Sequence, residues 1–239
     1  MRRGPRLPLE ELAPYLLQAT GDRRAGGVSP RIQRLSYPGV DAPGSPDLWP
    51  LDWREVFGND HPVALEVGFG KGLFLLTAAQ AHPEINFAGV EIVRKYQLYT
   101  ATRLAKRGLG NVRVACADAL QFLPRRVATA SLQAVHVYFP DPWWKKRHHK
   151  RRIFTAEFVA ECARILRPGG QLHAATDVEE YAQVMSAVLA EQAALRPLPP
   201  PTEHEPAHDL DYLTNFERKF RKQGKAIFRM SYERSQESF

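Results

Sequence analysis

Hydrophobic positions along this chain follow two rhythms, one typical of strands and one typical of helices. Short apolar runs of the kind that form buried strands lie at residues 63–67, 86–92, 112–116, 132–139 and 171–176. Apolar residues at helical spacing lie between and after them, at residues 73–80, 96–107, 153–166 and 181–189. Because strands that alternate with helices form βαβ units, this order predicts a parallel sheet covered by helices.

The two ends of the chain break this rhythm. Residues 1–60 contain eight of the 19 prolines and scattered arginines. Since proline fixes φ and removes a backbone donor, we expect an irregular, basic arm here and a single domain over residues 61–239. A proline cluster at residues 197–201 indicates a surface linker. After a basic helix at residues 215–222, the alternating residues 226–234 predict a strand that closes the sheet as an antiparallel edge.

Positive charge is concentrated in one short segment. The 239 residues have an ordinary globular composition, 44% hydrophobic and 25% charged, and a formal net charge of +7. Residues 145–152 alone hold six Lys or Arg and no acid, so the rest of the chain is near +1. This local excess indicates a polyanion bound at one place. Residues 214–234 hold seven Lys or Arg against two Glu and predict a second basic surface.

Several classes of protein are disfavoured. Cys116 and Cys162 are the only cysteines and lie far apart in apolar stretches, which argues against a disulfide framework and a thiolate metal site. No apolar run approaches the roughly 20 residues of a membrane helix, and the first residues lack a signal-peptide core. We expect a cytoplasmic protein without a metal or a membrane partner, either a monomer or a homodimer.

Glycines and acids follow the predicted strands. The turn after the first strand carries alternate glycines that allow positive φ beside a helix N-terminus with free N–H donors, namely Gly68, Gly70 and Gly72. Acids lie within or just past the ends of the first four strands, at Glu66, Glu91, Asp118 and Asp141. In an open parallel sheet such strand ends line one crevice. Four carboxylates repel a pyrophosphate but suit a cationic ligand with hydroxyl and amino donors, such as S-adenosylmethionine.

The acids can be assigned to parts of that ligand. A carboxylate such as Glu91 binds a ribose diol in bidentate fashion, Asp118 accepts from the adenine amine, and Glu66 neighbours the methionine end. Taken singly, a helix cap or a surface charge explains each acid better. Taken together, the four acids favour one shared ligand.

The sequence VYFPDPWWKKRHHKRR at residues 137–152 combines an acid, aromatic residues and cations. Two prolines stiffen the turn around Asp141, directly after a strand, so its position is preset. Trp143 or Trp144 is expected to stack on a base, and the cations that follow to meet phosphates. The adjacent His148 and His149 do not have metal-site spacing. The segment predicts a nucleic-acid base beside the methyl donor, with its backbone bound next to it.

These motifs resemble those of the bacterial tRNA (guanine-N7) methyltransferase family. The resemblance spans residues from about 63 to 234 and includes LEVGFGKG, GVEI, ADAL, VYFPDPWWKKRHHKRR, TD at 176–177 and TNFERK from Thr214. FPDPW followed by KKRHHKRR is its most specific part, although many relatives have proline in place of Trp144. The resemblance implies the Rossmann-like class I methyltransferase fold, a mostly parallel seven-stranded sheet with helices on both faces and an antiparallel C-terminal strand. It also implies S-adenosylmethionine as donor and N7 of guanine 46, in the tRNA variable loop, as target.

The resemblance and the residues together give each site residue an expected role. Asp141 is the implied catalytic residue. The expected donor-binding residues are Glu66, Gly68, Gly70, Gly72, Glu91, Asp118 and Asp141. The implied substrate-binding residues are Lys145, Asp177, Thr214 and Glu217. The expected contacts to the RNA backbone come from Lys146, Arg147, Lys150, Arg151 and Arg152.

Three other functions stay open at this stage. Asp-Pro-Trp-Trp also resembles the Asp/Asn-Pro-Pro-aromatic turn of enzymes that methylate exocyclic amines. A nonenzymatic RNA-binding module explains the basic segment but not the four acids. A nicotinamide-dependent dehydrogenase explains the glycines but neither the acids nor the polyanion patch, and it ranks last.

Overall fold

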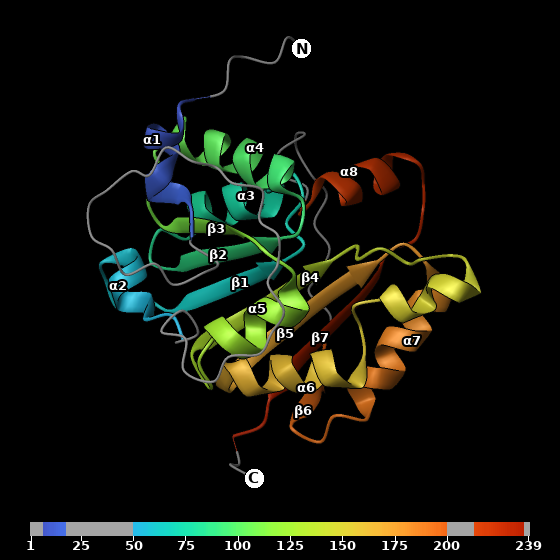
Figure 1. Cartoon of the computed structure of the whole chain (residues 1–239). Helices are drawn as coiled ribbons and strands as arrows, with labels where there is room; N and C mark the ends of the chain where they lie inside the picture. The colour runs from blue at the N-terminus through green and yellow to red at the C-terminus, as the bar shows by residue number, and fades with distance from the viewer. Residues whose placement is uncertain (1–6, 18–49, 200–212, 237–239) are drawn as a thin grey trace.

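A seven-stranded sheet forms the centre of the protein (Figure 1). The computed structural model describes residues 7–17, 50–199 and 213–236. Its strands are β1 (Val63–Val67), β2 (Asn86–Glu91), β3 (Val112–Cys116), β4 (Leu132–Tyr138), β5 (Leu166–Thr176), β6 (Leu195–Leu198) and β7 (Phe228–Arg234). They lie in the order β3-β2-β1-β4-β5-β7-β6, with β1 to β5 parallel and β7 antiparallel to both of its neighbours. The predicted fold class is confirmed.

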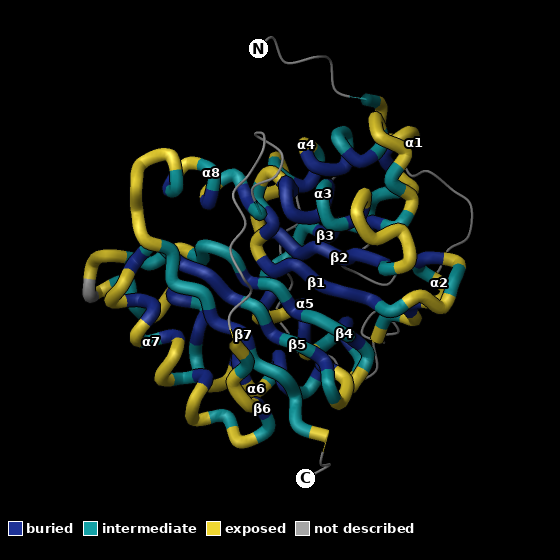
Figure 2. The backbone as a smooth tube through the Cα atoms, turned by 180° about the vertical axis from the view of Figure 1, so that it is seen from behind, coloured by how far each residue is buried: buried dark blue, intermediate teal, exposed yellow. Residues whose placement is uncertain are grey.

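Helices cover both faces of this sheet. One face carries α1 (Leu9–Leu12), the 3-10 helix η1 (Ala13–Tyr15), α3 (Leu73–Ala81) and α4 (Arg94–Ala105). The other face carries α2 (Trp53–Phe57), α5 (Ala119–Arg126), α6 (Ala156–Ile165) and α7 (Glu179–Ala190). The remaining helices are η3 (Lys146–Arg151) and α8 (Asn215–Lys222). Figure 2 shows the central strands buried between these two helical layers.

Alternate side chains of the central strands face opposite layers. Val63, Leu65 and Val67 belong to the apolar core under α5 to α7, whereas Ala64 belongs to the core under α3 and α4. Glu66 is in phase with Ala64, because side chains two positions apart lie on the same face of a strand. A carboxylate is thereby placed in an apolar layer.

The structure differs from the predicted order in four details. The last strand is not the edge, because β6 pairs with its outer side. Pro197, expected in a surface linker, lies in β6, where an edge strand tolerates the missing N–H. Strand β5 begins at Leu166, before the strand expected at residues 171–176. Helix α5 was not predicted, because Pro124 interrupts its short run of apolar residues.

The predicted N-terminal arm falls largely outside the described residues. Where residues 1–60 are described, they pack on the domain: Leu12 is buried against α3 and α4, and Leu16 forms a bridge with Val114 of β3. Helix α2 begins at an Asp52 cap and ends at Gly58, which has a φ of 72°. The domain boundary at residue 60 stays a prediction.

Candidate active site

The turn between β1 and α3 has the backbone geometry that its glycines predict. Gly68, Gly70 and Gly72 have φ values of 77°, 51° and 63°. At Gly72 an added Cβ would lie 2.3 Å from Cγ2 of Thr100, so conformation and packing both require glycine. The N–H groups of the glycines themselves are bonded within the protein. Gly68 donates its N–H to the Val90 carbonyl at 2.8 Å, and Gly72 to the Phe69 carbonyl at 2.7 Å.

Glu91, at the end of β2, fixes this turn. Its Oε2 accepts a hydrogen bond from the Gly70 N–H at 2.9 Å, and its Oε1 accepts one from the Val93 N–H at 2.9 Å. The residue is buried. All three glycine amides therefore donate within the protein and are not available to a phosphate.

Glu66 is a buried carboxyl with an unused oxygen. Only 4% of the residue is exposed, and among the described residues its Oε2 has no hydrogen-bond partner. Burial, and more weakly the charge of Glu91, raise the pKa of Glu66 from 4.5 to about 8. A buried carboxyl of this kind is satisfied by a ligand that brings positive charge or hydrogen-bond donors.

A cavity of about 360 Å³ lies against Glu66. The glycine turn contributes Gly68 and Gly70 to its wall, and α8 contributes its N-terminal residues from Thr214 onward. A carboxyl from β1, the first turn and a helix far along the chain therefore enclose one space. The other predicted donor- and substrate-binding residues do not line it, namely Gly72, Glu91, Asp118, Asp141, Lys145, Asp177 and Glu217.

Asp118 has the geometry of a helix cap. It precedes α5, and its carboxylate accepts a hydrogen bond from the Leu120 N–H at 3.0 Å. A carboxylate has further lone pairs, so this bond leaves acceptor capacity for a second donor. Its contact with adenine stays a prediction.

Asp141 lies in a constrained turn directly after β4. Phe139 and Trp143, on either side of it, have positive φ values of 53° and 47°, a region that non-glycine residues rarely adopt. Phe139 donates its N–H to the Ala175 carbonyl of β5 at 2.7 Å. The Asp141 side chain is exposed. Such strain persists only where the surroundings fix the backbone, and it is concentrated at functional sites.

The basic segment after this turn forms η3, and its cations face different ways. Lys145, Arg147, Lys150 and Arg151 are exposed, whereas Arg152 is buried. The two tryptophans, Trp143 and Trp144, have different surroundings. Arg151 lies 5.0 Å from the ring centroid of Trp143, and His148 packs against the edge of the same ring. Trp144 is 70% exposed and is the more accessible of the two rings, and the stacking of either ring on a base stays a prediction.

Three of the four implied substrate-binding residues form bonds within the protein, namely Asp177, Thr214 and Glu217. Thr214 caps α8 by accepting from the Glu217 N–H at 3.0 Å, and Glu217 accepts in return from the Leu213 N–H at 3.1 Å. The other Glu217 oxygen accepts from Arg229 at 2.7 Å. Asp177 forms an ion pair with Lys225 at 3.1 Å. These bonds position the side chains, and their contact with a substrate stays a prediction.

The sequence reasoning missed two residues on the Glu66 face of the sheet. Tyr138 lines the cavity, and its hydroxyl lies 2.8 Å from Nδ1 of His136. Burial, followed by the charge of Glu66, raises the pKa of Tyr138. The period of two along β4 was the available signal, since it places His136 and Tyr138 on one face.

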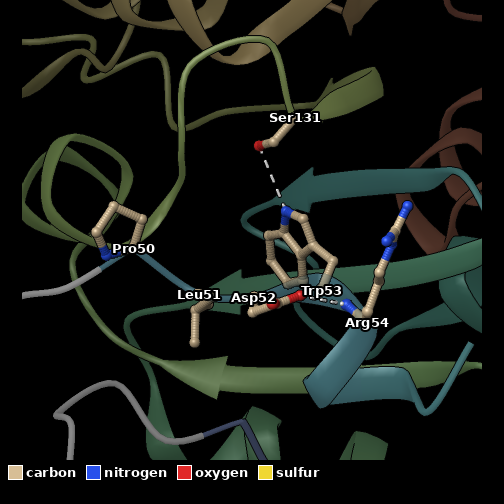
Figure 3. A pocket seen from close by; sticks show the side chains of 6 residues that line it. All are labelled: Pro50, Leu51, Asp52, Trp53, Arg54 and Ser131. Carbon is tan, nitrogen blue, oxygen red and sulfur yellow. Dashed lines mark hydrogen bonds between the residues drawn. The ribbon is translucent and has the colours of Figure 1, made fainter. Parts of the chain in front are cut away.

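A second cavity, of about 500 Å³, lies at the amino ends of β1 and β4, the opposite end of these strands from the glycine turn (Figure 3). Trp53 Nε1 donates to Ser131 Oγ there at 3.4 Å, and the Asp52 carboxylate accepts from the Arg54 N–H at 2.9 Å. Its polar side chains are thus used in capping and packing.

Over residues 7–17, 50–199 and 213–236, no acid, His or Cys cluster is arranged to hold a metal. No helix in the described part of the chain has the length and apolar character to cross a membrane.

Comparison with known proteins gives a consistent result. A family model described as "Putative methyltransferase" matches residues 60–230. A tRNA (guanine-N(7)-)-methyltransferase of Rhodopirellula baltica is 45% identical over 188 residues, which are 76% of this chain and 69% of that protein. The protein of the same name from Thiobacillus denitrificans is 40% identical over 92% of this chain and 94% of its own.

Solved structures of other methyltransferases share the fold. The aminoglycoside resistance methyltransferase NpmB1 matches with a TM-score of 0.54 at 17% identity, over 76% of this chain and 91% of its own. A SAM-dependent methyltransferase from Aquifex aeolicus matches with a TM-score of 0.51 at 13% identity, over 73% and 82%. At these identities the likeness concerns the fold alone.

Proposed function

Because the chain belongs to the bacterial tRNA (guanine-N7)-methyltransferase family, we propose that it transfers a methyl group from S-adenosylmethionine to N7 of a guanine in tRNA. We further propose that the target is guanine 46, in the variable loop. One observation carries the proposal. Glu66, whose Oε2 is unpaired among the described residues, faces a cavity in a protein that also presents a basic segment of exposed cations. The cavity suits a cationic donor, and the basic segment suits RNA.

Glu66, which lines the cavity, and Glu91, which bonds the glycine turn beside it, fit S-adenosylmethionine. A positively charged group of the donor would satisfy the buried Oε2 of Glu66. Each oxygen of Glu91 accepts one backbone N–H, which leaves lone pairs for a ribose diol. The glycine amides are occupied, which disfavours a pyrophosphate. When bound, S-adenosylmethionine supplies a methyl group on a sulfonium centre, which is electrophilic without further activation.

The chemistry asks mainly for alignment. Guanine N7 carries an in-plane lone pair and no proton, so no residue has to act as a base before transfer. Holding N7 in line with the methyl group supplies several kcal/mol through proximity alone. The product ring is cationic, and its N1 and N2 hydrogens become better donors. A carboxylate that accepts them stabilises the transition state more than the ground state.

Asp141 is the carboxylate that we assign to this role. Asp177 and Glu217, the other acids expected near the substrate, are engaged with Lys225 and Arg229. Asp141 is exposed and held in a strained turn after β4. It is therefore the acid best placed to accept from an incoming guanine.

The target position is tested with transcripts of one tRNA that differ only at position 46. The proposal predicts methylation of the transcript with guanine 46 and none when adenine replaces it. Digestion of each transcript to defined fragments, followed by identification of the methylated nucleoside in the fragment that contains position 46, maps the site. Equal methylation of both transcripts would contradict the assignment to position 46 and leave the activity itself standing.

Donor binding should release a proton from Glu66. At pH 6.5 this carboxyl is protonated because its pKa is about 8. A cationic group bound beside it favours the ionised form, so its pKa falls and about one proton leaves. Calorimetry with S-adenosylmethionine in two buffers of different ionisation enthalpy measures this number.

The Glu66→Gln variant is the control for this experiment, since it cannot release the proton. It also tests the pKa itself. Ionised Glu66 destabilises the ligand-free fold, so the free energy of unfolding should decrease as pH rises from about 5 to about 8. That decrease should be smaller in the variant. Equal proton release by both proteins would show that Glu66 does not meet the cationic donor.

Binding of tRNA should weaken steeply with salt. Among the side chains that the structure describes, four exposed cations precede Arg152 in the basic segment, at Lys145, Arg147, Lys150 and Arg151. Each phosphate contact contributes a slope of roughly −0.7 to −0.9 in a plot of log affinity against log salt, so four contacts give about −3. Fluorescence anisotropy with labelled tRNA between about 50 and about 200 mM KCl measures the slope. A flat response would show that the basic segment does not bind the RNA backbone.

A further inference from the structure

Arg152 differs from the other cations of the basic segment. Only 7% of it is exposed, whereas Arg147, Lys150 and Arg151 are exposed. A buried guanidinium is costly unless its donors are satisfied inside the protein. The sequence expectation that Arg152 binds the RNA backbone therefore conflicts with its surroundings.

The guanidinium of Arg152 joins two elements. Its Nε donates to the carbonyl oxygen of Pro142 at 2.8 Å, and its Nη2 donates to Oε1 of Glu180 at 3.3 Å. The same group lies 4.8 Å from the ring centroid of Tyr181. Pro142 directly follows Asp141, and both Glu180 and Tyr181 belong to α7. Arg152 thus ties the Asp141 turn to α7.

The strained turn around Asp141 has to be held in place on the Pro142 side as well as on the Phe139 side. Phe139 and Trp143 both have positive φ, a conformation that costs free energy in a non-glycine residue. On one side of Asp141, the Phe139 N–H is bonded to the Ala175 carbonyl of β5. On the other side, the Pro142 carbonyl is bonded to Arg152. The two bonds bracket Asp141.

Neighbouring groups agree with this arrangement. Burial raises the pKa of Tyr181, the nearby charge of Arg152 lowers it, and the charge of Asp141 adds to the rise. Tyr181 therefore lies within electrostatic reach of both residues. Its hydroxyl also accepts from the Phe154 N–H at 3.5 Å, which holds the chain just after Arg152.

We propose that Arg152 is a positioning residue, which holds the Asp141 turn in its strained conformation by bonding the Pro142 carbonyl and α7, and that it does not contact RNA phosphates. The proposal rests on the proposed function for its substrate, because turnover is measured on tRNA. The tie itself is a property of the free protein.

Two substitutions in the same segment separate positioning from phosphate contact. Arg152→Met should lower kcat at saturating tRNA by about 10²-fold, the order of loss expected from a misplacement of about 1 Å. The slope of log affinity for tRNA against log salt should not change. Lys150→Met, the matched comparison at an exposed position, should reduce the size of that slope by about 0.7 to 0.9.

Arg152→Lys is a second test of the proposal, and it can be used even if Arg152→Met does not fold. Lysine keeps the positive charge and hence any attraction to phosphate, but it lacks the planar Nε and Nη2 donors that reach Pro142 and Glu180 together. Its kcat should stay well below that of the unchanged protein. Wild-type kcat in Arg152→Lys would overturn the proposal.

Hydrogen exchange in the ligand-free protein tests whether Arg152 holds the Asp141 turn, and it does not depend on methyl transfer. Backbone amides within residues 139–144 should exchange faster in Arg152→Met and in Arg152→Lys, and at the original rate in Lys150→Met. Unchanged exchange in both Arg152 variants would overturn the proposal, as would a shallower salt slope with normal kcat. If the unchanged protein methylates no tRNA, the proposed function fails, and the exchange rates still decide the role of Arg152.

Discussion

Replacement of Asp141 by alanine is expected to lower the rate of methyl transfer by about 10²- to 10³-fold, the range typical of losing one preorganised electrostatic contact to a transition state. Guanine becomes cationic during transfer, so the carboxylate contributes most when charge has developed. This contact is made to the guanine and not to the donor. The dissociation constant of S-adenosylmethionine should therefore change far less than the rate. Single-turnover kinetics and calorimetry measure the two quantities.

Asp141→Asn is the matched control for this prediction. Asparagine keeps the size and one acceptor oxygen of the side chain but removes its negative charge, so its rate should lie between those of the original protein and the alanine variant. Near-normal turnover in Asp141→Ala would remove Asp141 from the mechanism. An equal loss of rate and donor affinity would make it a donor-binding residue only.

Glu91→Ala is expected to weaken donor binding by about 100-fold or more. Hydrogen bonds to a charged group are worth about 1.5 to 3 kcal/mol each, and a bidentate contact to the ribose diol comprises two. The substitution also removes the acceptor for the N–H groups of Gly70 and Val93, which loosens the glycine turn. Calorimetric titration with S-adenosylmethionine measures the loss.

The Glu91→Gln variant separates the two effects. One amide oxygen remains as an acceptor, but the amide NH2 faces N–H groups and is itself a donor. We expect donor affinity between those of the alanine variant and the original protein. Donor binding within about threefold of normal in Glu91→Ala would mean that the ribose is held elsewhere, since the loss predicted above is far larger.

The alternation of strands and helices predicted most of the sheet, because local hydrophobic period and tertiary burial agree there. The run at residues 112–116 coincides with β3, and the helix expected at residues 73–80 is α3 (Leu73–Ala81). Two elements were not predicted by the hydrophobic pattern. Pro124 lies within α5 and Pro197 within β6, and in both elements packing against the domain outweighs the local preference of proline.

Site residues could be predicted from the sequence where the order of the strands determines their position. They could not be predicted where a side chain bonds to an element far away in the sequence. Glu66 and Glu91 follow from strand ends, and the structure brings Glu91 into contact with the glycine turn. The approach of α8 to the cavity depends on a contact between segments about 150 residues apart, which no local pattern encodes. A run of cations likewise does not reveal that Arg152 faces α7.

The central claim is that this protein binds S-adenosylmethionine and places its methyl group on N7 of a guanine in tRNA. The most direct measurement is incubation of the purified protein with bulk tRNA and methyl-labelled S-adenosylmethionine, followed by identification of the labelled nucleoside. The account predicts label in 7-methylguanosine. Label in an exocyclic N-methyl nucleoside, or none in tRNA, would contradict it.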